Sequence, residues 1–204
     1  MIRIVACGVG NVRAYLNLYR AIGVAADVAL TPADLADASQ IILPGVGSFD
    51  WAMTRLAESG IRDRIEELVL VRQVPILAVC VGMQMLGTRS EEGQLPGLGW
   101  LNTEVRKFER NSQLGSLTMP HMVWNDIRVI GNDVLFRGLE HGARFYFLHS
   151  YYVHAFERSI VAAESDYGGE FVCAVKRDNI FGVQFHPEKS HRWGMQLLKN
   201  FSEI

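Results

Sequence analysis

The sequence predicts an α/β fold of three layers, in which a mixed, mostly parallel central sheet is flanked by helices. In the first half of the chain, short apolar runs alternate with helical patterns of roughly 10 to 15 residues, which is typical of parallel strands joined by right-handed crossovers. In the second half, from 97 to 185, Gly, Asn and Asp turns separate short β-rich runs. These runs predict a mixed or antiparallel extension of the sheet.

The first half should contain four strands, each an apolar run, at 2–7, 24–30, 40–43 and 75–79. Gly23 stands where a C-terminal glycine ends a helix, and Thr31-Pro32 and Ser48 are typical helix starts. These signals predict helices at about 11–22, 31–38, 48–57 and 61–72.

The second half should be rich in strands. The Arg177-Asp178-Asn179 segment is typical of a hairpin turn, and a final helix is expected at about 192–201. The expected strands are 98–108, 123–130, 143–152, 159–164, 171–175 and 180–185.

Composition excludes several classes of protein. The chain has 204 residues, of which 49% are hydrophobic and 21% charged, as in an ordinary globular protein. With no visible linker, we expect one domain over 1–204. A net charge of −2 gives no reason to expect nucleic acid, and no apolar run is long enough for a membrane helix. Three cysteines in no framework spacing fit a reducing cytoplasm.

Cys80 is a candidate nucleophile. It ends an apolar strand and precedes a helix-compatible run, so a sharp turn would present its thiol at the carboxyl edge of the sheet. A helix N-terminus favours the reactive thiolate, and Gly82 would let the backbone pass close to a neighbouring strand or a substrate. A lone cysteine at a strand end is also commonly a small buried hydrophobe, and we keep that interpretation for Cys7 and Cys173.

His186 and Glu188 form a candidate base and orienting acid. Residues two apart on an extended segment point to the same side, so the carboxylate can hold one imidazole nitrogen and leave the other free to take a thiol proton. A surface turn explains the same residues without function. Pro187 and the spacing to His191 rule out the helical zinc motif, so we expect no metal.

Pro44-Gly45-Val46-Gly47 follows the third expected strand. Its glycines can free backbone N–H groups for an oxyanion hole, although a simple tight turn is the ordinary interpretation. No Lys-Ser/Thr pair follows, which excludes a P-loop, and the Gly8–Arg13 segment lacks the third glycine of a dinucleotide loop. We therefore expect no cofactor.

In their order along the chain, these motifs resemble the class I (triad) glutamine amidotransferases. Val79 to Leu86 around the cysteine and Gly182 to Ser190 around the histidine carry the resemblance to the family. The blocks at 44–49, 120–125 and 186–190 narrow it to the glutaminase subunits of imidazole glycerol phosphate synthases. The resemblance covers nearly the whole chain.

The resemblance implies hydrolysis of glutamine to glutamate and ammonia. Cys80 would attack the substrate carboxamide, and His186, oriented by Glu188, would act as base and then acid. Backbone N–H groups near Val46 or Gly47 and at Val81 would meet the oxyanion. Gln84, otherwise a buried polar residue that needs a partner, is implied in substrate binding together with Gly45, His149, Ser150 and Tyr151.

The resemblance also implies a heterodimer. In the family, ammonia passes to a (β/α)8-barrel cyclase subunit docked over the glutaminase site. The positions that match the partner-facing surface are Asn11, Trp124, Asn125 and Lys189. Without the resemblance, Trp124 is a half-buried aromatic residue and Lys189 a solvated charge, although tryptophan is a favoured interface anchor.

Departures from the family pattern leave two alternatives open. Ala78 and Val123 replace usual glycines, and a β-branched residue resists positive φ, so Val123 indicates reduced flexibility or a paralogue. Such a paralogue would supply ammonia to a partner that amidinates a surface sugar, and the 97–100 segment resembles that branch. The other alternative is a catalytically silent regulatory or binding subunit, which the complete Cys80, His186 and Glu188 set disfavours.

Overall fold

A computed structural model describes residues 1–109, 111–112 and 115–204. Its central sheet has the order β2-β1-β3-β4-β15-β14-β12-β6-β5, with β13 and β10 joined beside β14. The first five strands in this order run parallel. They are β2 (Ala26–Ala29), β1 (Ile2–Val5), β3 (Gln40–Gly45), β4 (Ile76–Cys80) and β15 (Ile180–Val183).

The remaining strands extend this sheet mainly by antiparallel pairing, as predicted. The edge pair β5 and β6 runs parallel. These strands are β5 (Arg89–Ser90), β6 (Thr103–Lys107), β10 (Arg128–Val129), β12 (Tyr151–Ala155), β13 (Val161–Asp166) and β14 (Glu170–Arg177).

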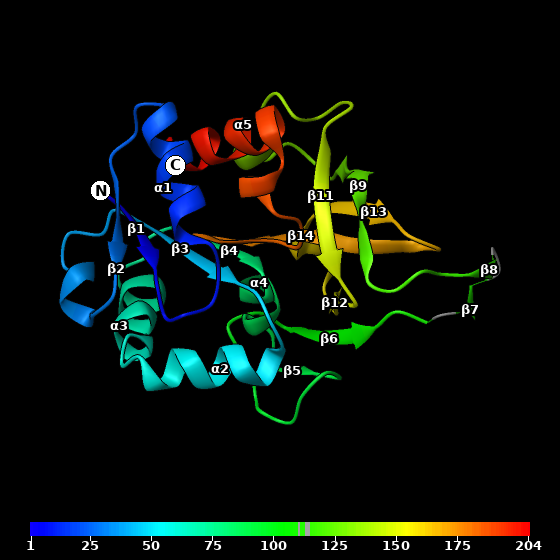
Figure 1. Cartoon of the computed structure of the whole chain (residues 1–204), viewed down its shortest axis with the longest axis horizontal. Helices are drawn as coiled ribbons and strands as arrows, with labels where there is room; N and C mark the ends of the chain where they lie inside the picture. Colours follow the sequence, from blue (N-terminus) through cyan, green and yellow to red (C-terminus); the bar gives the residue numbers. More distant parts are fainter. Residues whose placement is uncertain (110, 113–114) are drawn as a thin grey trace.

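Helices cover both faces of the sheet and make the three layers (Figure 1). The helices α1 (Val12–Ala21) and α5 (His191–Ser202) lie on one face. The opposite face carries α2 (Phe49–Glu58), α3 (Arg62–Glu66) and α4 (Val81–Met85). Because β3, β4 and β15 are buried along their whole length, they read as continuous apolar runs. The predicted fold class is confirmed.

Two expected helices differ from the structure. The segment at 31–38 forms only one 3-10 turn, η1 (Pro32–Leu35). The segment at 61–72 begins as α3 and widens into a π turn, η2 (Glu67–Val71). The other short 3-10 turns are η3 (Val134–Phe136), η4 (Arg158–Ile160) and η5 (Pro187–Lys189).

The expected strand at 98–108 is wrong in its first half, because only Thr103–Lys107 is a strand. Residues 98–101 instead bond to the end of α4 and the turn after it: the Leu98 N–H donates to the Met85 carbonyl at 2.8 Å, and the Leu101 N–H to the Leu86 carbonyl at 3.0 Å. This segment buries Leu98 and Trp100 in the core. The apolar residues of the 98–101 segment are therefore explained by burial beside the end of α4 and not by a strand.

The expected single strand at 143–152 is two strands that belong to different sheets. The first, β11 (Arg144–His149), pairs with β9 (His121–Asp126), and the second, β12, joins the main sheet opposite β6. The chain changes partner at Ser150, whose carbonyl accepts from the Phe108 N–H at 3.3 Å. A further short pair comprises β7 (Asn111–Ser112) and β8 (Gly115–Ser116).

The predicted hairpin turn at 177–179 is confirmed. Arg177 pairs with Ile180 across β14 and β15, so Asp178 and Asn179 form the two-residue connection. Asp178 has φ 52°, as this tight connection requires. Among the described residues, no helix is both long and apolar enough to cross a membrane.

Candidate active site

Cys80 lies in a strained turn between β4 and α4, with φ 56° and ψ −115°. The turn packs tightly against β3. A Cβ on Gly82 would lie 2.3 Å from the Leu43 carbonyl oxygen, and a Cβ on Gly45 would lie 2.2 Å from the Gly82 nitrogen. Both positions therefore need glycine, and the predicted close approach of Gly82 to a neighbouring strand is confirmed.

His186 and Glu188 are joined by a hydrogen bond of 2.8 Å between Nδ1 and Oε1. The expected extended segment is wrong after His186, because Pro187 begins the 3-10 turn η5; this turn brings the carboxylate within hydrogen-bonding distance of the ring. Each of the two side chains is only 3% exposed. The backbone N–H of His186 also donates to the backbone carbonyl of Tyr146 at 2.9 Å, which holds this turn against β11.

The electrostatics of this pair depend on Cys80. Burial lowers the pKa of His186, but the neighbouring Cys80 sulfur and the Glu188 carboxylate together raise it to about 10. Burial raises the pKa of Glu188, but its hydrogen bond to His186 and the imidazolium charge hold it below its usual value. The arrangement therefore favours a charged imidazole between a sulfur and a carboxylate.

A cavity of about 270 Å³ contains both Cys80 and His186. It brings together most of the residues expected to bind substrate or oxyanion, whereas Gly45 lies beneath the cysteine turn and outside the lining. The predicted residues that line the cavity are Val46, Gly47, Cys80, Val81, Gln84, His149, Ser150, Tyr151, His186 and Lys189.

Gln84 is held by two partners, as its burial requires. Its amide nitrogen donates to the Gln184 side-chain oxygen at 3.0 Å and to the Tyr151 carbonyl at 3.2 Å. Gln184 in turn donates to the Cys80 sulfur at 3.6 Å. Gln84 thus connects the cysteine turn with the cavity wall.

His149 belongs to a chain of neutral hydrogen-bonding groups. Its Nδ1 lies 2.7 Å from the Tyr151 carbonyl and can only donate to it, so its Nε2 accepts from Nδ1 of His121 at 3.0 Å. The remaining nitrogen of His121 faces the Asn125 amide at 3.4 Å. Burial lowers the pKa of His121 to about 4 and that of His149 to about 3, so both rings are neutral at pH 7.

The residues expected at a partner surface occupy three places. Asn11 caps α1, because its side-chain oxygen accepts from the Ala14 N–H at 3.3 Å. Trp124 on β9 stacks on His191, with ring centroids 5.2 Å apart and planes at 5°. Asn125 is tied to the histidine chain, whereas Lys189 lies over the Tyr146 ring, 5.5 Å from its centroid.

Val123 takes an ordinary strand conformation in β9, where it pairs with Phe147. It is not among the described residues with positive φ. Its side chain is 42% exposed, and its neighbour Met122 is 61% exposed. The valine therefore causes no backbone strain here and adds to an exposed apolar edge beside Trp124.

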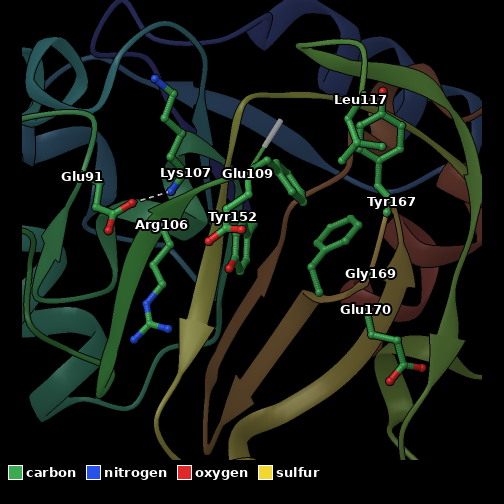
Figure 2. A pocket seen from close by; sticks show the side chains of 12 residues that line it. Glu91, Arg106, Lys107, Glu109, Leu117, Tyr152, Tyr167, Gly169 and Glu170 are labelled. Carbon is green, nitrogen blue, oxygen red and sulfur yellow. Dashed lines mark hydrogen bonds between the residues drawn. The ribbon is translucent and has the colours of Figure 1, made fainter. Parts of the chain in front are cut away.

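A second cavity, of about 660 Å³, has neither Cys80 nor His186 in its lining (Figure 2). The lining includes the aromatic residues Tyr152 and Tyr167 and the charged residues Arg106 and Glu170. Arg106 is already paired with Glu104 at 2.7 Å. None of the predicted site residues lines this cavity.

Several residues near the site had no role in the sequence analysis. Glu92, Pro120 and Leu148 line the cavity, and one Glu92 oxygen accepts from the Phe49 N–H at 2.8 Å. The sequence could have pointed to Gln184, because a polar residue inside the apolar 180–185 run needs a buried hydrogen-bond partner. The contact of Tyr15 with Glu188 had no local signal, because the two residues are 173 positions apart.

On this fold, a strand-end cysteine and a histidine bonded to a carboxylate lie at one cavity, which is the arrangement that a cysteine nucleophile with a histidine base requires. The family model described as glutamine amidotransferase class-I matches residues 4–204. The chain therefore belongs to the class I glutamine amidotransferases.

Similarity to individual proteins agrees with the family. Two proteins named imidazole glycerol phosphate synthase subunit HisH, from Bdellovibrio bacteriovorus and Leptospira interrogans, are 53% and 48% identical over 204 residues, covering 100% of each chain. The solved structure of PurLQS from Thermotoga maritima shares the fold, with a TM-score of 0.73 at 19% identity over 98% of this chain and 96% of that one. The chain is thus an enzyme, a glutamine amidotransferase (glutaminase) subunit.

Proposed function

We propose that this chain is the cytoplasmic glutaminase subunit of an imidazole glycerol phosphate synthase, acting as one domain over 1–204. It hydrolyses glutamine and passes the ammonia to a (β/α)8-barrel cyclase subunit. The observation that carries the proposal is the placement of Cys80 and His186 in one cavity, with Glu188 bonded to the far side of the imidazole. Full-length similarity to subunits named HisH supports the choice of pathway.

The reaction follows from these positions. The Cys80 thiolate attacks the side-chain carboxamide carbon of glutamine, and His186 gives a proton to the amide nitrogen, so that ammonia leaves and a thioester remains. His186 then takes a proton from water as the water attacks the thioester; the sulfur leaves as the thiolate, which releases glutamate and restores the thiolate–imidazolium pair. Glu188 holds the imidazole in the required orientation throughout. Side chains and water are sufficient for these steps.

The oxyanion of each tetrahedral intermediate needs preorganised donors. Val46, Gly47 and Val81 line the cavity beside the cysteine, and their backbone N–H groups are the proposed donors. Gln84, His149, Ser150 and Tyr151 are the proposed substrate-binding wall, and Gly45 supports it through the packing of the cysteine turn. Glu92 adds a carboxylate that suits the substrate ammonium group.

The cyclase subunit is proposed to dock over the cavity mouth. Lys189 lines the cavity, and Trp124 lies next to two exposed apolar residues of β9, Met122 and Val123. An aromatic residue beside an exposed apolar side chain on the same strand face, as Trp124 is beside Met122, is typical of an interface anchor. Asn11 and Asn125 complete the proposed surface.

Glutamine hydrolysis by the wild type and by Cys80→Ala tests the proposal. Each is assayed alone and with an imidazole glycerol phosphate cyclase subunit and its nucleotide substrate. Cys173→Ala is the matched control, because Cys173 is also buried but lies in β14 and outside the cavity. We expect hydrolysis that needs Cys80, survives Cys173→Ala and rises strongly with the cyclase.

Other outcomes separate the alternatives. Hydrolysis that needs Cys80 but ignores the cyclase would favour ammonia supply to a sugar-amidinating partner. No hydrolysis under any condition would favour a silent regulatory subunit.

A further inference from the structure

Tyr15, on α1, places its hydroxyl against the Glu188 carboxylate. The hydroxyl donates to Oε2 at 2.9 Å, while Oε1 of the same carboxylate accepts from His186 at 2.8 Å. Tyr15 is 1% exposed, and the Glu188 side chain is 3% exposed. Each carboxylate oxygen therefore has a protein partner on a different side.

This phenol has the properties of a fixed donor. Burial, with the nearby Glu188 charge, raises the pKa of Tyr15 well above its ordinary value, so the hydroxyl keeps its proton at every working pH. The helix that carries it is anchored by the Asn11 cap one turn earlier and contacts both η5 and α5. A buried carboxylate with one oxygen unpaired would be costly and free to rotate.

We propose that Tyr15 is a positioning residue for glutamine hydrolysis, which acts through Glu188 on the His186 imidazole. The inference rests on the proposed role of His186 as general base and acid. The phenol keeps Glu188 ionised and sets the plane of its carboxylate. That plane, in turn, sets the direction in which the free imidazole nitrogen faces Cys80.

The same helix supplies a matched control. Tyr19 lies one turn after Tyr15 and is fully buried, but its hydroxyl has no hydrogen-bond partner among the described residues. Tyr15→Phe and Tyr19→Phe therefore remove the same atom from the same helix and keep the ring that packs in the core. Only Tyr15→Phe removes a hydrogen bond to the catalytic carboxylate.

The first experiment measures kcat and KM for glutamine hydrolysis across pH for the wild type and both Phe variants, with the cyclase subunit present. We expect Tyr15→Phe to lower kcat about tenfold, since hydrogen bonds to a buried charge are the strong ones. KM should change less than about twofold, since Tyr15 does not line the cavity. The acid limb of the profile should move to higher pH, because Glu188 becomes easier to protonate. Tyr19→Phe should match the wild type.

A double-mutant cycle distinguishes positioning from general stability. In the Glu188→Gln background, Tyr15→Phe should change kcat less than about twofold, because the carboxylate through which it acts is gone. A tenfold loss in both backgrounds would overturn the proposal, as would equal kcat and equal pH profiles for the two Phe variants. Denaturant unfolding of each variant identifies any loss caused by misfolding.

Alkylation of Cys80 by iodoacetamide tests the role of Tyr15 without any substrate, so it does not depend on glutamine being the substrate. The pH at half-maximal alkylation reports the thiolate–imidazolium pair directly, with Cys80→Ala as the blank. We expect that pH to shift in Tyr15→Phe and not in Tyr19→Phe. An inactive wild type with this shift would contradict the proposed function alone, whereas an active wild type without it would contradict the positioning role alone.

Discussion

Replacing Gly82 with alanine tests whether the close packing of the cysteine turn on β3 is needed for catalysis. The added methyl group would lie 2.3 Å from the Leu43 carbonyl oxygen, whereas ordinary van der Waals contact begins at 3.4 Å. Gly82 does not have a positive φ, so the clash is the main penalty. The turn that carries Cys80 must therefore retreat from β3 by about 1 Å.

The size of the effect follows from that displacement. A reacting atom misplaced by about 1 Å costs about 100-fold in rate, and overpacking of this kind costs about 1–3 kcal/mol of unfolding free energy. A domain of ordinary stability tolerates such a loss. We therefore expect Gly82→Ala to fold and to lower kcat for glutamine hydrolysis about 100-fold.

Steady-state hydrolysis and urea unfolding, measured on the same preparations, check this prediction. Gly23→Ala is the control, because Gly23 has φ +73° and no atom within 4 Å of an added Cβ. Its cost of about 1–2 kcal/mol arises from backbone strain alone, after α1 and outside the cavity. Retention of kcat within twofold in Gly82→Ala, or an equal loss in Gly23→Ala, would refute the reasoning.

Three further predictions concern stability and association. The free energy of unfolding in urea should fall as pH drops from about 6.5 to 4, by about 1.4 kcal/mol for each unit by which burial lowers the pKa of His121. The reason is that His121 binds a proton in the unfolded chain over this range and stays neutral in the folded one. His121→Gln should flatten this slope, and His141→Gln, at an exposed histidine, should not. Trp124→Ala should weaken association with the cognate partner well over tenfold by calorimetry, and Phe156→Ala, exposed at the far end of β12, should not. Asn200→Leu should cost about 1–3 kcal/mol in denaturant unfolding, because it removes the donor of the buried Leu135 carbonyl and of the part-buried Arg137 carbonyl.

Each of these predictions has a result that contradicts it. An acid slope unchanged by His121→Gln would show that His121 does not govern acid stability. Equal partner affinity for Trp124→Ala and the wild type would remove Trp124 from the interface. A loss below about 0.5 kcal/mol for Asn200→Leu, the range of ordinary surface changes, would show that these carbonyls find other partners.

The parallel half of the sheet could be predicted strand by strand from the sequence. Strands such as Ile76–Cys80 are buried on both faces, so each appears as an apolar run between turn signals. The later strands could be located but not correctly divided. The 143–152 run stays β-rich while its pairing partner changes from β9 to β6, and periodicity carries no information about the partner.

In the site, too, some features could be predicted from the sequence and others could not. Cys80 at a strand end and His186 two residues before Glu188 are local patterns, so the sequence could single them out as candidates, and the family resemblance then implied their roles. The hydrogen bonds that hold them are not local. Gln184 reaches the cysteine from 104 positions away, and Tyr15 reaches Glu188 from 173 positions away.

Tyr15 and Tyr19 show why the distant hydrogen bonds of the site could not be predicted from local sequence. They are the same residue type, one turn apart on one helix, and both are buried, so local propensity and hydrophobic pattern treat them alike. One hydroxyl holds the Glu188 carboxylate and the other has no partner among the described residues. The difference arises because the Tyr15 hydroxyl meets the distant Glu188 carboxylate, 173 positions away, and the Tyr19 hydroxyl meets no such group among the described residues. The residues proposed to perform the reaction could thus be located from short motifs, whereas the contact of the residue proposed to orient them arises only from the fold.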